Sequence, residues 1–457
     1  MKKIYRKIYR RLPVVILSLI MLISISACSG DENDTININA TEAEQTIPTE
    51  NEQTIPTGDE STKETTGNDT IENNASSENG TGDNNNDKSD VSTEVSTKNP
   101  SEEPTEQATF SQPEITLLMV GDILLHDRVQ DSSVQEDGSY NYDAIFENVS
   151  EEIKAVDLAI VNQEVIIGGK NLGISGYPNF NAPFELGDAL VKTGFDVVCH
   201  GTNHALDKGR KGLLSCLQFW KTTYPHMAIL GINETQEEKD EIYVYEQDGI
   251  KIAILNYTYG TNGISLPSDM PFAVDLLKKE EVIEDIKEAE RIADFTVVCP
   301  HWGTEYVLEQ TGEQERWAKI FLENGVDLVI GTHPHVIEPI EMLTDPSTGN
   351  QMLVYYSIGN FVNWTGESGK GKANRMVGGM AEVTISLDEG GNPIIKDYGV
   401  TAVVSHVSYG TNGVYTMKLS DYTQELSLTS AMIKQDSSYS KDYLVSLCNK
   451  VWGDMWE

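Results

Sequence analysis

The chain has 457 residues and a formal net charge of −39, with 33 basic residues against 72 acidic ones. Nucleic-acid binding requires a basic surface, so this charge argues against a nucleic-acid partner and also against electrostatic docking on anionic lipid. The five cysteines show no CxxC spacing, which argues against a zinc ribbon or a disulfide framework, and Cys199 and Cys299 are expected to be buried thiols.

Residues 1–27 have the composition of a secretory signal. Basic residues precede an apolar run from Leu12 to about Ile25, which is short for a membrane-spanning helix. The segment resembles a bacterial lipoprotein signal peptide, with Ile25-Ser26-Ala27-Cys28 as the lipobox. This resemblance implies cleavage before Cys28 and lipidation of its thiol. The alternative is an uncleaved membrane helix, and both interpretations predict attachment to the cell membrane with the remaining chain on the extracytoplasmic face.

Residues 28–112 are expected to form a disordered acidic linker. Asn, Thr, Ser, Glu, Asp and Gly dominate this segment, and aromatic residues are almost absent. Such a composition cannot bury enough apolar surface to offset the loss of chain entropy. We therefore interpret the segment as a tether that spaces a folded domain from the membrane.

From residue 113 onward, strand-like and helix-like segments alternate. Apolar runs typical of buried strands lie at 115–120, 158–161, 196–199, 252–255, 295–298, 327–330 and 352–356. Amphipathic segments at 184–193, 278–294 and 312–324 predict helices. This alternation predicts an α/β domain over residues 113–365 with buried strands.

The chain beyond residue 365 is expected to complete this domain. Two more alternating runs, at 379–387 and 394–406, predict additional antiparallel strands within residues 366–412. Residues 413–457 are expected to form a helical extension that packs on the edge of the domain.

Polar residues follow the apolar runs, and six of the eight histidines lie in these loops. In open α/β sheets, ligands bind at the carboxyl ends of the strands, so these loops are expected to meet at one edge. Carboxylates, imidazoles and an asparagine carbonyl make a mixed set of nitrogen and oxygen donors, which suits Mn, Fe or Zn. The segments are Gly121-Asp122 with His126, Asn162-Gln163-Glu164, His200 to His204 with Asp207, His301 to Glu305, His333-Pro334-His335, and Ser357 to Asn360.

In combination, these motifs resemble the CapA-type capsule biosynthesis proteins, also called PgsA in poly-γ-glutamate systems, over about residues 115–361. That family resembles the calcineurin-like metallophosphatases. The resemblance implies a four-layer αββα sandwich with two divalent metal ions at its strand ends. The metal ligands that the resemblance implies are Asp122, Glu164, Asn203, His301, His333 and His335. His126, the histidine nearest to Asp122 in the sequence, is a further candidate ligand.

The resemblance also implies roles for individual residues. Glu164 takes the place of the carboxylate that bridges the two ions, where the phosphatase pattern has an aspartate. His204 is the expected proton donor to a leaving group, and Asp207 is expected to orient it. Glu305 is expected to orient His301, and Asn360 is a further supporting residue of the site. In place of the phosphatase Asp-x-His motif, the nearest histidine is His126, four residues after Asp122.

Three functional hypotheses follow from these residues. The first is metal-assisted hydrolysis or transfer, at a phosphoester or at an amide of a polymer such as poly-γ-glutamate. The second is a non-catalytic component of a capsule synthase or exporter that binds an anionic polymer through its metal site. The third is a purely structural surface protein. The expected partners are the membrane, through the lipid anchor, and an anionic capsule polymer or its synthase subunits.

Overall fold

The computed structural model describes residues 112–457. The expected signal peptide, Cys28 and nearly all of the expected tether therefore lie outside the described residues. No helix within residues 112–457 is long and apolar enough to span a membrane.

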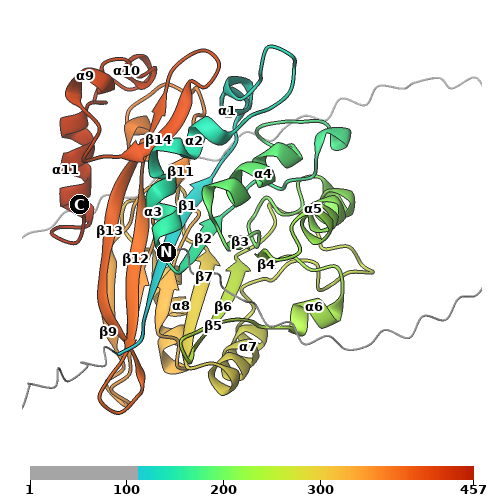
Figure 1. Cartoon of the computed structure of the whole chain (residues 1–457), viewed down its shortest axis with the longest axis vertical. Coiled ribbons are helices and arrows are strands. Elements are labelled where there is room, and N and C mark those ends of the chain that lie inside the picture. The colour runs from blue at the N-terminus through green and yellow to red at the C-terminus, as the bar shows by residue number, and fades with distance from the viewer. Residues whose placement is uncertain (1–111) are drawn as a thin grey trace, which may run out of the picture. The chain divides into compact units, whose positions relative to one another are not determined.

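Two β-sheets form the centre of the domain (Figure 1). The first sheet has the strand order β14-β13-β12-β1-β2-β3-β4, and β11 pairs in parallel with β1. Its strands are β1 (Glu114–Ile123), β2 (Leu158–Asn162), β3 (Val197–Cys199), β4 (Ala228–Leu230), β11 (Asn360–Val362), β12 (Val377–Leu387), β13 (Pro393–Val407) and β14 (Val414–Lys418). The second sheet has the order β5-β6-β7-β8-β10-β9. Its strands are β5 (Tyr243–Gln247), β6 (Ile250–Thr258), β7 (Phe295–His301), β8 (Leu328–Ile330), β9 (Ile340–Thr344) and β10 (Gln351–Tyr355).

Helices lie on the outer faces of the two sheets (Figure 1). Those connecting β1 to β5 are α1 (Asp127–Ser132), α2 (Asp143–Phe146), α3 (Ser150–Ala155), α4 (Phe184–Thr193), α5 (Gly209–Thr223) and α6 (Gln236–Asp240). The second sheet is covered by α7 (Lys279–Ile292) and α8 (Gly312–Glu323), and the chain ends with α9 (Gln424–Ser427), α10 (Met432–Gln435) and α11 (Lys441–Val451). Short 3-10 turns are η1 (Glu147–Val149), η2 (Lys170–Leu172) and η3 (Lys372–Met376).

Strand β6 shows why the sheets stack in layers. Successive side chains of a strand point to opposite faces of the sheet. Ile252 and Ile254 enter the core that the second sheet shares with the first, whereas Ala253 and Leu255 enter a separate core beneath α7 and α8. Both faces of the strand are thus apolar and buried, as expected for a sheet between two layers. The resulting order of helices, sheet, sheet and helices is the four-layer αββα sandwich that the family resemblance implies.

The apolar periodicity predicts these elements closely. All seven apolar runs are strands, and the three amphipathic segments form α4, α7 and α8. Helix α8 begins with a capping box, in which the Thr311 hydroxyl accepts from the Gln314 backbone N–H and the Gln314 side chain accepts from the Thr311 N–H. Strands β12 and β13 pair in an antiparallel arrangement. The segment 413–457 begins with a strand, β14, which pairs with β13, and its helices α9 to α11 follow.

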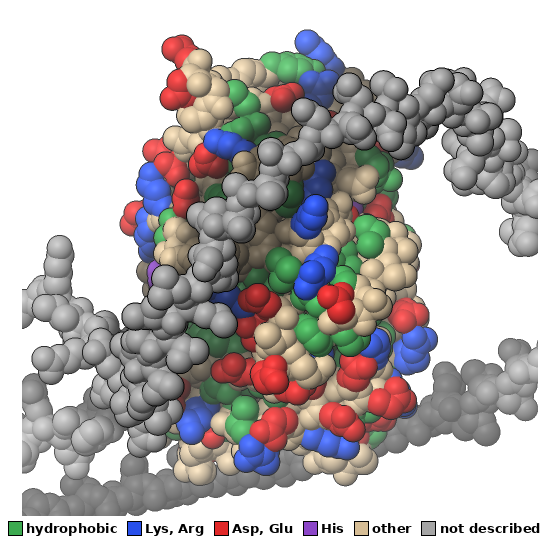
Figure 2. Space-filling model, turned by 90° about the vertical axis from the view of Figure 1, so that its right-hand side faces the viewer, with side chains coloured by type: hydrophobic (Ala, Val, Ile, Leu, Met, Phe, Trp, Pro, Cys, Tyr) green, Lys and Arg blue, Asp and Glu red, His purple; other side chains and the backbone are tan. Residues whose placement is uncertain are grey.

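Acidic side chains gather on the lower half of the face shown in Figure 2, where α6 and α7 lie. The cysteines of the described chain are free and buried, including Cys199 in β3 and Cys299 in β7.

Candidate metal centre

A close contact between β1 and β11 fixes the position of Asp122. The Asp122 backbone N–H donates to the Gly359 carbonyl oxygen at 3.0 Å, and Asp122 is paired in register with Asn360. A Cβ atom on Gly121 would lie 2.0 Å from the Gly359 oxygen. Only glycine therefore permits this approach, which explains why the Gly-Asp dipeptide stands at the end of the strand.

Glu164 lies at the centre of the site. It follows β2, and its side chain is 0% exposed. Neither carboxylate oxygen has a hydrogen-bond partner within the described part of the chain. Imidazole Nε2 atoms lie near its Oε1 at 3.6 Å for His335, 3.7 Å for His301 and 3.9 Å for His204. These separations are longer than hydrogen bonds, so a buried carboxylate faces three ring nitrogens without direct pairing.

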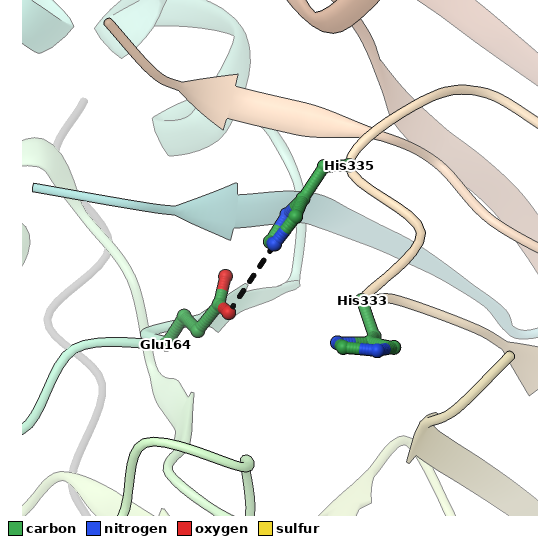
Figure 3. A group of neighbouring side chains, drawn as sticks. All are labelled: Glu164, His333 and His335. Atoms are coloured by element: carbon green, nitrogen blue, oxygen red, sulfur yellow. Dashed lines mark ion pairs between the residues drawn. The ribbon is translucent and has the colours of Figure 1, made fainter. Parts of the chain in front are cut away.

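The loop after β8 carries His333 and His335, and both have positive φ angles, of 99° and 58°. Such angles are uncommon for residues other than glycine and are found where surrounding contacts hold the backbone. Here the His333 backbone N–H donates to both Asp122 oxygens at 3.3 Å, and His335 Nδ1 lies 3.1 Å from Asp122 Oδ2. Figure 3 shows Glu164 and His335 pointing toward each other, with His333 beside them. A ligand atom from each of these three residues lies within 4.8 Å of the other two.

Asn203 and His301 face each other across the site. Asn203 Oδ1 lies 3.0 Å from His301 Nε2, while the Asn203 Nδ2 group donates to Asn262 Oδ1 at 3.3 Å. His301 Nδ1 lies 3.0 Å from the Thr332 hydroxyl. When Nδ1–H donates to Thr332, the lone pair of Nε2 faces the Asn203 oxygen. In this tautomer both atoms are free to bind a shared cation, whereas in the other tautomer Nε2–H donates to the Asn203 oxygen.

His204 forms a separate pair with Asp207 beside this cluster. Its Nδ1 lies 2.7 Å from Asp207 Oδ2, which also accepts from the Phe180 backbone N–H at 2.7 Å. The edge of the Phe180 ring packs against the imidazole, with centroids 4.7 Å apart. These contacts hold His204 with Nε2 directed toward Glu164, at the 3.9 Å given above.

Burial and mutual charge perturb the groups of the cluster. Desolvation raises the pKa of Glu164 well above its ordinary value, an effect that His335 opposes and Asp122 reinforces. Desolvation also lowers the pKa values of His301 and His333 well below the ordinary range. For His335, burial lowers the pKa, but Glu164 and Asp122 outweigh it and raise the value to about 9.

The donor set fits divalent metal ions. Glu164 is a buried carboxylate without a hydrogen-bond donor, and His333 Nδ1 is likewise buried without a partner within residues 112–457. An unpaired buried carboxylate is costly, and a cation shared with the neighbouring imidazoles removes that cost. Mixed carboxylate, imidazole and amide oxygen donors are typical of Mn, Fe or Zn sites.

The structure brings together most of the residues singled out from the sequence. Asp122, Glu164, Asn203, His301, His333 and His335 form the cluster, with His204 and Asp207 beside it and Asn360 Oδ1 3.1 Å from His335 Nδ1. The candidate ligands come from both sheets. Asp122 lies near the end of β1 and Glu164 follows β2 in the first sheet, whereas His301 ends β7 and both His333 and His335 follow β8 in the second.

Two of the predicted residues lie beside the cluster. His126 is at the N-terminus of α1, its ring contacts Tyr177 and Phe180, and it lines the same cavity as His204 and His335. Its role as a metal ligand stays a prediction. Glu305 lines this cavity as well, and the side-chain partners of His301 are Thr332 and Asn203, so the role of Glu305 in orienting His301 also stays a prediction.

Sequence reasoning missed three supporting residues. Asn162 donates to Asp122 Oδ1 at 2.8 Å, although it stands in a motif from which only Glu164 was selected. Thr332 precedes His333 and contacts His301. Asn262, which contacts Asn203 and His204, lies in the loop after β6, where no motif drew attention.

A cavity of about 740 Å³ adjoins the cluster. His204 and His335 line one part of it. The rest is lined by residues at the start of α1, by Tyr177 and Phe180, and by residues from the loop after β7 and from the segment that contains η3. The cavity is large enough for a ligand of several functional groups, so the cluster is accessible to more than water.

Residues 116–365 match the family model described as bacterial capsule synthesis protein PGA_cap. The chain belongs to this family. Two curated family relatives are the capsule biosynthesis protein CapA of Bacillus anthracis, 28% identical over 265 residues, and the PGA biosynthesis protein CapA of Bacillus subtilis (strain 168), 29% identical over 265 residues. The matches cover 55% and 56% of this chain and span 61% and 66% of the relatives' own lengths.

Among solved structures, this PGA_cap protein is similar to the 5'-nucleotidase precursor from Thermus thermophilus. The identity is 14%, the TM-score is 0.40, and the match covers 74% of this chain and 59% of the other.

Proposed function

We propose that this member of the capsule synthesis family is a metal-dependent hydrolase that acts on a phosphoester or on an amide of a capsule polymer such as poly-γ-glutamate. In this proposal, two divalent cations occupy the cluster. Asp122 and His335 would hold the first ion, Asn203, His301 and His333 would hold the second, and Glu164 would serve both.

One observation carries the proposal, namely the state of Glu164. Its carboxylate is buried and lacks a hydrogen-bond donor, while three imidazole nitrogens lie 3.6–3.9 Å from Oε1. A purely structural role for these histidines would leave both buried Glu164 oxygens without a hydrogen-bond partner, and such groups are rare in folded proteins. Cations between the carboxylate and the imidazoles would give these oxygens a partner.

The protein's own residues supply the remaining chemistry. Divalent ions, when bound at such a site, lower the pKa of water and polarise the bond to be cleaved. Asp207 Oδ2 accepts from His204 Nδ1 and so fixes the orientation of the ring. A protonated His204 then donates from Nε2 to the departing oxygen or nitrogen atom, and this general-acid step contributes typically ~10²–10⁴-fold.

We further propose that the protein acts at the extracytoplasmic face of the cell membrane, held by lipid on Cys28. Its partners in this proposal are the capsule polymer or subunits of its synthase. The family membership supports a role in capsule synthesis, and the N-terminal sequence supports the anchor. Globomycin, which blocks lipoprotein signal cleavage, should cause the uncleaved chain to accumulate, and Cys28→Ser should abolish labelling by a radioactive fatty acid.

Metal analysis of the full chain, purified in detergent, tests the centre. Wild type should contain about two Mn, Fe or Zn ions per chain, and Glu164→Gln should lose most of them. Glu338→Gln is the matched control, because Glu338 is also 0% exposed but lies outside the cluster. The proposal fails if wild type takes up no transition metal, or if Glu164→Gln and Glu338→Gln retain equal amounts.

Activity separates the hydrolase from the non-catalytic alternative. Wild type loaded with metal should cleave a phosphodiester reporter or shorten poly-γ-glutamate, and His204→Ala should reduce the rate while keeping the metal. Polymer binding without turnover by a fully metallated wild type would instead favour a polymer-binding component of a synthase.

A further inference from the structure

Three basic side chains line the cavity that adjoins the cluster, namely Arg128, Lys372 and Arg375. They are unusual in a chain with 33 basic and 72 acidic residues. The described part of the chain contains five arginines, and the other three form ion pairs with Asp269, Glu288 and Glu313 on the surface. Two of the five described arginines therefore line the cavity into which a ligand of the cluster would extend.

Arg375 is held in a defined position. Its side chain is only 10% exposed, and its guanidinium carbon lies 3.4 Å from the centroid of the Tyr306 ring. A cation above an aromatic face at this distance is attracted by the ring. Its Nη1 also contacts Glu367 Oε2 at 3.1 Å. A planar guanidinium fixed in this way presents a fork of donors suited to carboxylate or phosphate.

Two backbone contacts connect Arg375 to the metal centre. The Arg375 carbonyl accepts from Asn360 Nδ2 at 2.9 Å, and the Oδ1 of the same Asn360 lies 3.1 Å from His335 Nδ1. Tyr306, beneath the guanidinium, donates its backbone N–H to the Pro334 carbonyl at 2.7 Å. The distance from the guanidinium to the cluster is therefore set by the same residues that position His335.

Tyr306 has a φ angle of 68°, in the left-handed region that a bulky side chain rarely adopts. Its ring lies between Arg375 and His335, with centroids of the Tyr306 and His335 rings 5.9 Å apart. This strained backbone is what places the aromatic face under the guanidinium, and strain of this kind is concentrated at binding sites.

Four carboxylates, those of Asp127, Asp131, Glu305 and Glu367, line the cavity beside its three basic side chains, but within residues 112–457 only Glu367 forms an ion pair with any of the three. Glu367 is the single carboxylate that pairs with both Lys372 and Arg375, and its side chain is 57% exposed. Arg128 forms no ion pair within residues 112–457 and lies over the Trp364 and Tyr409 rings. Asp127 already accepts from the Gly176 backbone N–H at 2.7 Å.

We propose that this cavity is an oxyanion-recognition subsite in which Arg375 is the main specificity-determining residue, assisted by Lys372 and Arg128. The ligand that it selects carries a carboxylate or a phosphate group next to the bond presented to the cluster. The inference rests on the proposed function and deepens it, because it names the chemical class of the substrate of that same site.

Calorimetric binding to the full chain in detergent tests this subsite, with inorganic phosphate and a γ-linked glutamate oligomer as two separate probes. Arg375→Gln should weaken binding of the recognised probe by roughly tenfold to a hundredfold, the loss expected for a hydrogen-bonded charge. Arg128→Gln, at an exposed position that tolerates the change, should weaken it less. Arg316→Gln is the matched control, because Arg316 also pairs with a glutamate but lies on α8, outside the cavity.

Loss of oligomer binding alone would identify a carboxylate polymer as the ligand, and loss of phosphate binding alone would identify a phosphoester. The inference is overturned if wild type binds neither probe, or if both cavity variants bind like Arg316→Gln. Measurements on chelator-treated and metal-loaded protein, with metal content determined in parallel, keep this result separate from the metal proposal. If the protein binds no metal but its binding of a probe still depends on Arg375, the subsite proposal stands and the hydrolase proposal fails.

Discussion

Wild type should lose stability as the pH rises because of Glu338, and replacement of Glu338 by glutamine should remove this loss. Glu338 follows the His333-Pro334-His335 loop and is fully buried. Its Oε2 accepts from Gln314 Nε2 at 2.6 Å, whereas Oε1 has no partner within the described residues. Its backbone carbonyl accepts from the Trp452 indole at 3.0 Å. The residue thus joins the ligand loop to α8 and to the end of α11.

The magnitude follows from the pKa of Glu338. Desolvation, opposed in part by the hydrogen bond from Gln314, raises this pKa from 4.5 to about 8. Below about pH 4.5 the Glu338 carboxyl is protonated in both the folded and the unfolded chain, so its burial then costs the folded state no ionisation energy. Between about 4.5 and 8 the unfolded chain releases the proton while the folded chain keeps it, so stability falls as pH rises. The difference between the two pKa values corresponds to about 5 kcal/mol as an upper bound.

Chemical denaturation of wild type and Glu338→Gln, each followed from pH 5 to pH 9, measures this effect. The free energy of unfolding of the variant, relative to wild type, should increase by several kcal/mol over this range. Glu323→Gln, at a side chain that is 52% exposed, serves as the control and should follow wild type. Parallel pH profiles for wild type and Glu338→Gln would refute the assignment of a raised pKa.

Three other perturbations test the site and its supports. Removal of bound metal by a chelator should lower the melting temperature, because an ion present at a hundred times its Kd stabilises the folded state by about 2.7 kcal/mol. Asp207→Asn should reduce kcat by roughly 10²-fold at unchanged metal content, because His204 loses the carboxylate that accepts from its Nδ1 and orients the ring. Gly121→Ala should destabilise the protein by about 1–3 kcal/mol in denaturant unfolding, because its Cβ would meet the Gly359 carbonyl.

Each of these outcomes has its own control. Re-addition of Mn²⁺ or Zn²⁺ should restore the melting temperature, and a chelator without effect on it would contradict metal binding by the folded state. Asp269→Asn, at an exposed position, should leave kcat unchanged, and an equal loss there would remove the specific role of Asp207. Gly312→Ala, where a Cβ meets no neighbour, should cost nothing, and equal stability of Gly121→Ala would show that β1 and β11 can separate.

The sequence predicts the layers well because the strands are buried on both faces. Ile252 to Leu255 is apolar throughout, since alternate residues enter two different cores, and such a run is visible without any structure. The sequence analysis did not predict helix α5, the short helices, or the strands β4, β5, β9, β11 and β14. Residues Asn360–Val362 of β11 form a strand because they pair with β1, and no local pattern encodes that partner.

The site was predictable to the extent that its residues follow strands. Asp122, Glu164 and His301 stand directly at strand ends, so the topology alone gathers them. His126 lies beyond the strand end, where the direction of the side chain depends on the N-terminus of α1 rather than on the sheet. Arg375 reaches the cavity from the 3-10 turn η3 and Asn262 reaches the site from a loop, and their contribution depends on local conformations that periodicity does not report.

The division of the ligands between two sheets determines when the site can form during folding. Asp122 and His335 are separated by 213 positions in the chain, and Asn203 and His301 by 98. Contacts between such distant segments require the closure of long loops and form late. An ion that uses ligands of both sheets can bind only after the two sheets have docked. The rate of metal binding during folding should therefore be limited by the docking of the sheets rather than by diffusion of the ion to the protein.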